Sequence, residues 1–120
     1  MVGTAFNAKL LPLRVLGKCG GYMSDIADAI VWASGGKVTG VPANPNPATV
    51  INLSLGGYGS CSTIIGNAIT GAVTRGTAVV VAAGNSNMDV ATSMPANCAN
   101  VIAVAAVSYT HLTLPTNREV

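Results

Sequence analysis

Hydrophobic residues fall in short continuous blocks that are separated by segments rich in glycine, asparagine and proline. Four blocks are too short for typical helices and are predicted as strands, over residues 9–16, 49–53, 78–83 and 101–106. The block 78–83 (AVVVAA) has no polar alternation, so both of its faces are expected to be buried, as in parallel sheets. Pro12 places the first strand at a sheet edge or a bulge.

Two longer segments show helical spacing instead. Ser24 or Asp25 can cap a helix that runs to Ser34, before a pair of glycines. A second helix is predicted over residues 63–75, with Ser60 or Ser62 as its cap. The alternation of strands and helices predicts an α/β protein, namely a partial, doubly wound parallel sheet of about four strands with two helices and right-handed crossovers.

Composition removes several classes of function. The chain has 120 residues, enough for about one domain, and only 8 % are charged, with a formal net charge of +2. No basic cluster exists that would mark a nucleic-acid partner. The longest apolar runs, 78–83 and 101–107, fall short of the roughly 18 residues that a membrane span needs, and Lys9 and Pro12 interrupt any signal peptide. So few charges suggest the middle of a larger protein, with apolar faces prone to self-association.

The last segment, 108–120, lacks the Gly/Ala/Val texture of the body and carries the only histidine, His111. It resembles the translation of a transposase adapter used in sequencing libraries, running from about residue 107 to 116. We therefore divide the chain into 1–107 and a non-native tail, 108–120, and assign no chemistry to His111. The alternative is a genuine polar surface tail.

Glycine-rich or polar segments follow the predicted strands, at 17–22, 54–59 and 84–86. In open α/β sheets, ligands bind beyond the carboxyl ends of the strands, where glycine lets the backbone approach closely. These segments are candidate binding loops, although each could equally be a simple tight turn.

Several stretches, taken in order, resemble the subtilase family of subtilisin-like serine proteases. They are LPLRVLGKCGGYMSDIADAI, VINLSLGG, VVVAAGNSN and PANCANVIAVAA, and the resemblance covers about residues 3–106. The most specific signal is N-x-S-x-G-G after one strand followed by A-A-G-N after the next. In residue composition the stretches are most similar to secreted bacterial members with disulfides. The resemblance therefore implies a secreted endopeptidase that acts on peptides or proteins.

The resemblance implies roles for particular residues. Asn85 matches the family's oxyanion-hole asparagine, whose amide donates to the tetrahedral intermediate; the alternative is a left-handed turn residue after a glycine. The matching substrate-binding positions form two pocket walls and one strand that pairs with the substrate backbone. One wall is Ser54, Leu55, Gly56 and Gly57, the other is Ala82, Ala83 and Gly84, and the pairing strand is Gly20, Gly21 and Tyr22.

The catalytic triad of the family has no match in this chain. Its Asp and His would precede residue 1 and its Ser would follow residue 107, in that order along the chain. Asp25 and Asp28 are interpreted as helix-dipole partners or surface charges, and Asp89 as a turn residue. We therefore expect the chain alone to be inactive.

Three cysteines make an odd count. Cys19 and Cys61 follow adjacent strand ends in the loops that would flank the cleft, so we predict a disulfide between them, with Cys98 left over. This pairing favours an oxidising, extracellular setting, whereas three buried thiols would be the intracellular alternative. Calcium is common in the family, but no carboxylate cluster is visible here, so no metal site and no cofactor are assigned.

Two other classes of function remain as alternatives. A nucleotide-binding loop could be formed by Gly57-Tyr58-Gly59-Ser60-Cys61-Ser62, but the last glycine of G-x-G-x-x-G is missing and no acidic residue ends the next strand. An α/β-hydrolase could use Ser54, Asp89 and His111 in that order, but the G-x-S-x-G elbow lacks its first glycine.

Overall fold

The computed structural model describes residues 3–106, and its elements alternate much as the sequence predicts. The predicted tail 108–120 and the boundary at residue 107 lie outside this range. In chain order the elements are α1 (Met23–Ala33), β1 (Val50–Leu53), β2 (Gly57–Tyr58), α2 (Thr63–Thr74), β3 (Ala78–Ala82), the 3-10 helix η1 (Val90–Thr92), β4 (Ser93–Met94) and β5 (Ile102–Val104).

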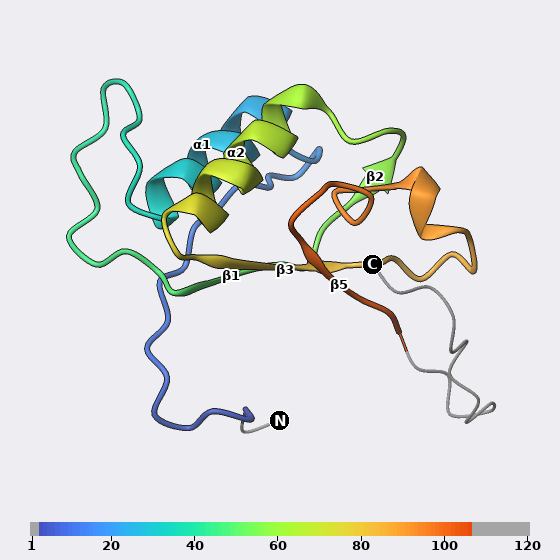
Figure 1. Ribbon diagram of the computed structural model, residues 1–120, viewed down its shortest axis with the longest axis horizontal. Helices are drawn as coiled ribbons and strands as arrows, with labels where there is room; N and C mark the ends of the chain where they lie inside the picture. The colour runs from blue at the N-terminus through green and yellow to red at the C-terminus, as the bar shows by residue number, and fades with distance from the viewer. Residues whose placement is uncertain (1–2, 107–120) are drawn as a thin grey trace.

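Three of the strands form a parallel sheet in the order β1-β3-β5. Leu53 lies opposite Val81, and Val81 lies opposite Ala103. The strands β2 and β4 form a separate antiparallel pair of two residues each. Both helices lie side by side on one face of the parallel sheet (Figure 1). The predicted α/β class, with a mostly parallel sheet and two helices, is confirmed.

The core lies between this face and the helices. Ile51 and Leu53 on β1, and Val79 and Val81 on β3, are buried because alternate side chains of a strand point to the same face. The helices contribute isoleucine, which fills the core, and alanine, whose small side chain lets the helices approach closely. Their buried residues are Ile26, Ala27, Ile30 and Ala33 on α1, and Ile65, Ala68, Ile69 and Ala72 on α2.

The helix ends show how local sequence sets the boundaries. As predicted, Ser62 caps α2, and its Oγ accepts a hydrogen bond from the backbone N–H of Ile65 at 3.3 Å. Neither Ser24 nor Asp25 caps α1, because that helix begins at Met23 and Tyr22 occupies the cap position without a side-chain hydrogen bond.

The predicted strand over residues 9–16 is absent. Its residues join no strand ladder, and Leu10 is 91 % exposed. A strand requires a neighbour with free hydrogen-bonding groups, and this segment turns away below the sheet (Figure 1). Pro12 also removes one donor. An apolar run was therefore not sufficient evidence for a strand.

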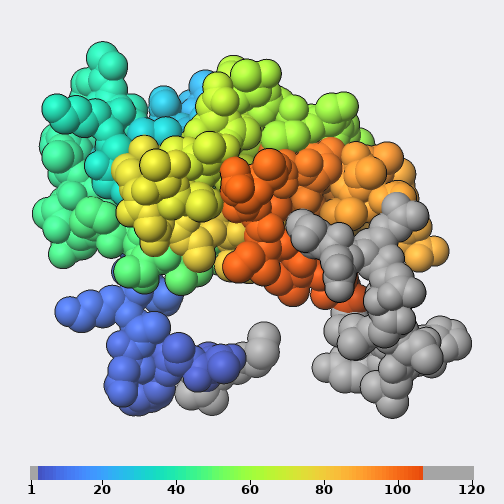
Figure 2. All heavy atoms as spheres, in the orientation of Figure 1, coloured from blue at the N-terminus to red at the C-terminus, as the bar shows by residue number. Residues whose placement is uncertain are grey.

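The expectation that β3 is buried on both faces is also wrong. Val79 and Val81 are buried, but Ala78 is exposed and Val80 is only half-buried. The reason is that both described helices cover the same face. On the opposite face, Val50 and Ile102 are each 56 % exposed. Figure 2 shows the N-terminal segment standing apart from the main body below the sheet. None of the described helices is long and apolar enough to cross a bilayer.

Candidate functional site

The carboxyl ends of β1 and β3 lie next to each other, because the two strands are parallel and Leu53 pairs with Val81. Ser54 therefore leaves β1 beside the point where Ala83 leaves β3. Two of the three candidate binding loops are thus brought to the same edge of the sheet, which is where ligands bind in open α/β folds.

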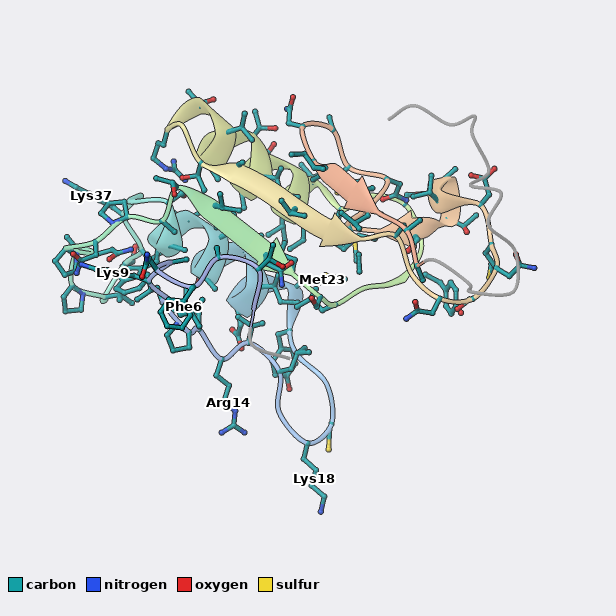
Figure 3. All side chains as sticks on the ribbon, turned by 90° about the horizontal axis from the view of Figure 1, so that it is seen from below. Phe6, Lys9, Arg14, Lys18, Met23 and Lys37 are labelled. Atoms are coloured by element: carbon teal, nitrogen blue, oxygen red, sulfur yellow. A yellow bond between two sulfur atoms is a disulfide. The ribbon has the colours of Figure 1, made fainter. Side chains whose placement is uncertain are left out.

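A pocket of about 360 Å³ opens beside the exit from β1. We call it the strand-exit pocket. Its walls are glycine backbone and mostly apolar side chains, a lining suited to an apolar group. The lining residues are Leu16, Gly20, Gly21, Met23, Ile26, Ser54, Leu55, Gly56, Gly57, Ile65, Met94 and Pro95. Figure 3 shows Met23, at the start of α1, close to the end of β1.

Two of the lining glycines are required by close backbone approach. A Cβ on Gly56 would lie 2.9 Å from the carbonyl oxygen of Met94. A Cβ on Gly21 would collide with the carbonyl oxygen of Val15. A side chain at either position would displace the neighbouring backbone, so both glycines are needed for the observed shape of the pocket lining.

The pocket includes only some of the predicted binding residues. Gly20, Gly21 and all four residues of the stretch 54–57 line it. Tyr22 is 78 % exposed and does not line the pocket, and neither does the stretch 82–84 that was predicted as its second wall.

Met94 and Pro95 also line the pocket, next to Gly56 and Gly57, although nothing in the sequence had indicated a role for them. They belong to the stretch PANCANVIAVAA and its preceding methionine, so the resemblance had pointed to the region without giving its function. Met23, Ile26 and Ile65 were also missed, because their helical spacing predicts a buried face and nothing more.

Asn85 is exposed, and its side chain makes no hydrogen bond with any described residue. The preceding Gly84 has φ of 100°, which directs the chain away from the end of β3. The alternative interpretation of Asn85 as a left-handed turn residue is wrong, because the positive φ values of this loop belong to Gly84 and Asn87. The Asn85 amide is available to donate to a ligand.

The wall that contains Met94 is held by the antiparallel pair. Gly57 lies opposite Met94, and Tyr58 lies opposite Ser93. Gly56, Gly57, Met94 and Pro95 together make what we call the β2–β4 wall of the strand-exit pocket.

The predicted Cys19–Cys61 disulfide is wrong. Cys61 is bonded to Cys98, with 5.0 Å between their α-carbons, and Cys19 is exposed with a free thiol. The two segments diverge: Gly17 and Gly20 bond to each other, so Cys19 lies in the tight turn between them. Lys18, at the tip of that turn, projects away from the body (Figure 3). Cys61 lies just before α2, where the segment after β4 reaches it.

The other predicted sites show simpler roles. Gly57 and Tyr58 form strand β2 and pair with β4, so the first half of this glycine-rich stretch is a strand and not the tight turn of a dinucleotide loop, although its end, Ser62, does cap α2. Asp89 caps η1 by accepting a hydrogen bond from the N–H of Ala91 at 3.0 Å. Ser54 accepts one from the Asn52 side chain, while His111 lies outside the described residues. Across residues 3–106, no group of three or more His, Cys, Asp or Glu side chains could hold a metal ion.

The chain is thus an α/β protein with a parallel sheet, and its pocket and the exposed Asn85 amide lie at the carboxyl edge of that sheet, where open α/β folds bind ligands. A sequence model of the subtilase family matches residues 1–119. The chain belongs to the subtilase family, and the resemblance noted from the sequence is confirmed.

Similar proteins come from several bacteria. An extracellular protease of Xanthomonas campestris pv. campestris is 71 % identical over 108 residues, which are 90 % of this chain and 19 % of that protein. An extracellular basic protease of Dichelobacter nodosus is 48 % identical over 90 % of this chain and 18 % of its own. This chain therefore spans about a fifth of the length of these relatives.

Solved structures agree with this relationship. A protease from Pseudoalteromonas arctica has a TM-score of 0.86 at 62 % identity, over 88 % of this chain and 31 % of that one. Sphericase has a TM-score of 0.70 at 36 % identity, over 87 % of this chain and 32 % of its own.

Proposed function

We propose that this chain is part of a secreted serine endopeptidase and supplies its substrate cleft and one catalytic donor. The observation that carries the proposal is the strand-exit pocket lying at the same sheet edge as the free amide of Asn85. The names of the relatives support an extracellular protease. The Cys61–Cys98 disulfide supports an oxidising environment.

An extended peptide would bind by adding a strand beside residues 20–22. Gly20 exchanges both backbone hydrogen bonds with Gly17, and the carbonyl of Tyr22 accepts from Ile26. The N–H and C=O of Gly21 bond to no described residue. Gly21 is therefore the residue of this stretch that can exchange both hydrogen bonds with a substrate backbone.

The strand-exit pocket would receive an apolar side chain of the same peptide. Its volume of about 360 Å³ and its Leu, Met and Ile lining favour apolar over charged groups, because a charge there would lose its water without gaining a partner. Alternate side chains of an extended strand point to the same side, so a peptide paired with Gly21 can place one of them in the pocket.

Asn85 would act when the peptide carbonyl becomes tetrahedral. Negative charge then develops on the carbonyl oxygen, and Nδ2–H of Asn85 donates a hydrogen bond to it. The donor lowers the barrier because it is directed at that position before the reaction begins. Loss of such a donor reduces kcat by about a hundred- to a thousand-fold, a magnitude established for a subtilisin itself.

The nucleophile, base and orienting carboxylate are proposed to lie outside the matched positions of this chain. The isolated chain should therefore bind peptides without cleaving them. A chromogenic peptide assay combined with active-site titration tests this directly. No turnover and no burst is the expected result, and a stoichiometric burst would overturn the proposal.

The role of Asn85 can be tested in a chimera in which the 108-residue segment replaces its counterpart in the Xanthomonas relative. Asn85→Ala should lower kcat by the factor given above and leave KM nearly unchanged. The matched control is Asn67→Ala, which removes the same amide from the exposed face of α2. Equal, small effects of the two substitutions would refute the oxyanion role.

A further inference from the structure

We propose that Asn97 is a positioning residue that acts with the Cys61–Cys98 disulfide to hold the β2–β4 wall of the strand-exit pocket in place. The proposal assigns a function to two features that the catalytic chemistry does not use. Its consequence for peptide binding rests on the proposed function, but its structural content does not.

The β2–β4 wall is weak by itself. Its ladder consists of two residue pairs, and a two-stranded ladder of that size is marginal in water. One of those pairs, Gly57 with Met94, is part of the pocket lining. Any fraying of the ladder would therefore change the shape of the pocket.

Asn97 links the two sides of this ladder. Its Nδ2 donates to the carbonyl oxygen of Gly59, just after β2, at 2.8 Å. It also donates to the carbonyl oxygen of Ala91, in η1 just before β4, at 3.0 Å. The ladder is extended by a bond from the Gly59 N–H to the Thr92 carbonyl at 3.0 Å. One amide group thus fixes the chain on both sides of the wall.

The orientation of the Asn97 side chain carries a free-energy cost. Its Oδ1 is buried and has no hydrogen-bond partner among the described residues. An unsatisfied buried carbonyl is unfavourable, so the two bonds donated by Nδ2 must offset it. This orientation is understandable if those two bonds hold the segments together.

The disulfide restrains the same segments covalently. Cys61 follows β2 by three residues, and Cys98 directly follows Asn97. The disulfide limits how far the segments can separate, while Asn97 sets how they align. The facing wall comes from residues 20–26, just before and within the first turn of α1, and the two acceptors of the Asn97 amide lie outside that segment. The effect of Asn97 should therefore be local.

The test compares Asn97→Asp with Asn100→Asp. The first substitution keeps the shape but replaces both donors with a carboxylate oxygen that faces two carbonyls. The second makes the same charge change three residues away, where the amide bonds only to Thr70 on α2. Asn97→Ala serves as a milder variant that removes the bonds without adding charge.

The readout is amide hydrogen exchange in the full chain without ligand. The reporters for the wall are the bonded amides of Gly59 and Cys98, and those for the core are Ile69 and Ala72 in α2. Both Asn97 variants should speed exchange at the wall by about tenfold or more and leave the core within about twofold. Asn100→Asp should leave the wall unchanged.

Two results would overturn the proposal. Unchanged exchange at the wall would show that Asn97 holds nothing there, and an equal increase at wall and core would show a general stabilising role. Binding of an apolar tetrapeptide, measured in parallel, should weaken in both Asn97 variants only. If the unaltered chain binds no peptide, the proposed function fails, whereas the exchange data still decide the role of Asn97.

Discussion

Removal of the Cys61–Cys98 disulfide should cost this protein much of its stability. The two cysteines are 37 residues apart in sequence, and the entropy of closing a loop of that length gives about 4 kcal/mol at room temperature. The loop contains α2 and β3, so the bond restrains a large part of the core in the unfolded chain. Cys98 is buried, and its replacement by alanine adds only a small packing loss.

The perturbation is the double variant Cys61→Ala/Cys98→Ala, and the control is Cys19→Ser. Urea unfolding followed by circular dichroism gives the free energy of unfolding of each. We expect a loss of about 3–4 kcal/mol in the double variant. Because stabilities of small domains are only about 5–15 kcal/mol, partial unfolding in buffer is a further expected sign. Cys19→Ser should change stability by less than about 0.5 kcal/mol, since Cys19 is exposed.

Two results would contradict this expectation. If Cys19→Ser cost about as much stability as the double variant, Cys19 would be a bonded partner, and if the double variant cost less than about 1 kcal/mol, the disulfide would not restrain the unfolded chain as described. Peptide mapping by mass spectrometry under non-reducing conditions gives an independent answer, because each pairing links different proteolytic fragments.

Three further predictions concern the core, the pocket and the open face of the sheet. Because Ile69 is fully buried, Ile69→Ala should lower the free energy of unfolding by about 2–5 kcal/mol in a urea titration. Ile64 lies on the exposed side of α2, so Ile64→Ala should cost less than about 1 kcal/mol, and equal losses would contradict the described packing. Gly56→Ala should weaken apolar peptide binding by about tenfold or more in isothermal titration, because the added Cβ would lie 2.9 Å from the β4 backbone. The control is Gly57→Ala, whose added Cβ has no atom within 4 Å. Similar affinities for both variants would argue against the pocket as the binding site. Light scattering should show concentration-dependent association of the chain, and Ile102→Lys should reduce it by charging the open sheet face; a monodisperse parent chain would contradict this expectation.

The helices could be predicted to within one residue at most ends, because their apolar residues repeat at the helical period and glycine or serine marks their limits. The strands β1 and β3 could be located for a related reason, since each is a short apolar run between turn residues. The segment 9–16 has the same local pattern but no partner strand in the structure. Pairing depends on the path of the whole chain, which a local pattern does not contain.

The residues of the candidate site could also be predicted only in part from the sequence. Residues 54–57 could be placed at the pocket because the carboxyl ends of neighbouring parallel strands meet at one edge. Met94 and Pro95 could not, because they reach the pocket through a pairing of two residues on each strand, between segments far apart in sequence. The cysteine pairing failed for the same reason: three cysteines allow three pairings, and only the path of the loops selects one.

Binding of an extended peptide at the carboxyl edge of the sheet underlies every functional proposal made for this chain. The most direct measurement is a chemical-shift titration of the isotopically labelled chain with a blocked tetrapeptide of apolar residues. We expect the largest shifts at the backbone amide of Gly21, along residues 54–57 and at the side-chain amide of Asn85. Absence of binding, or shifts centred on the helix surfaces or on the open face of the sheet, would contradict it.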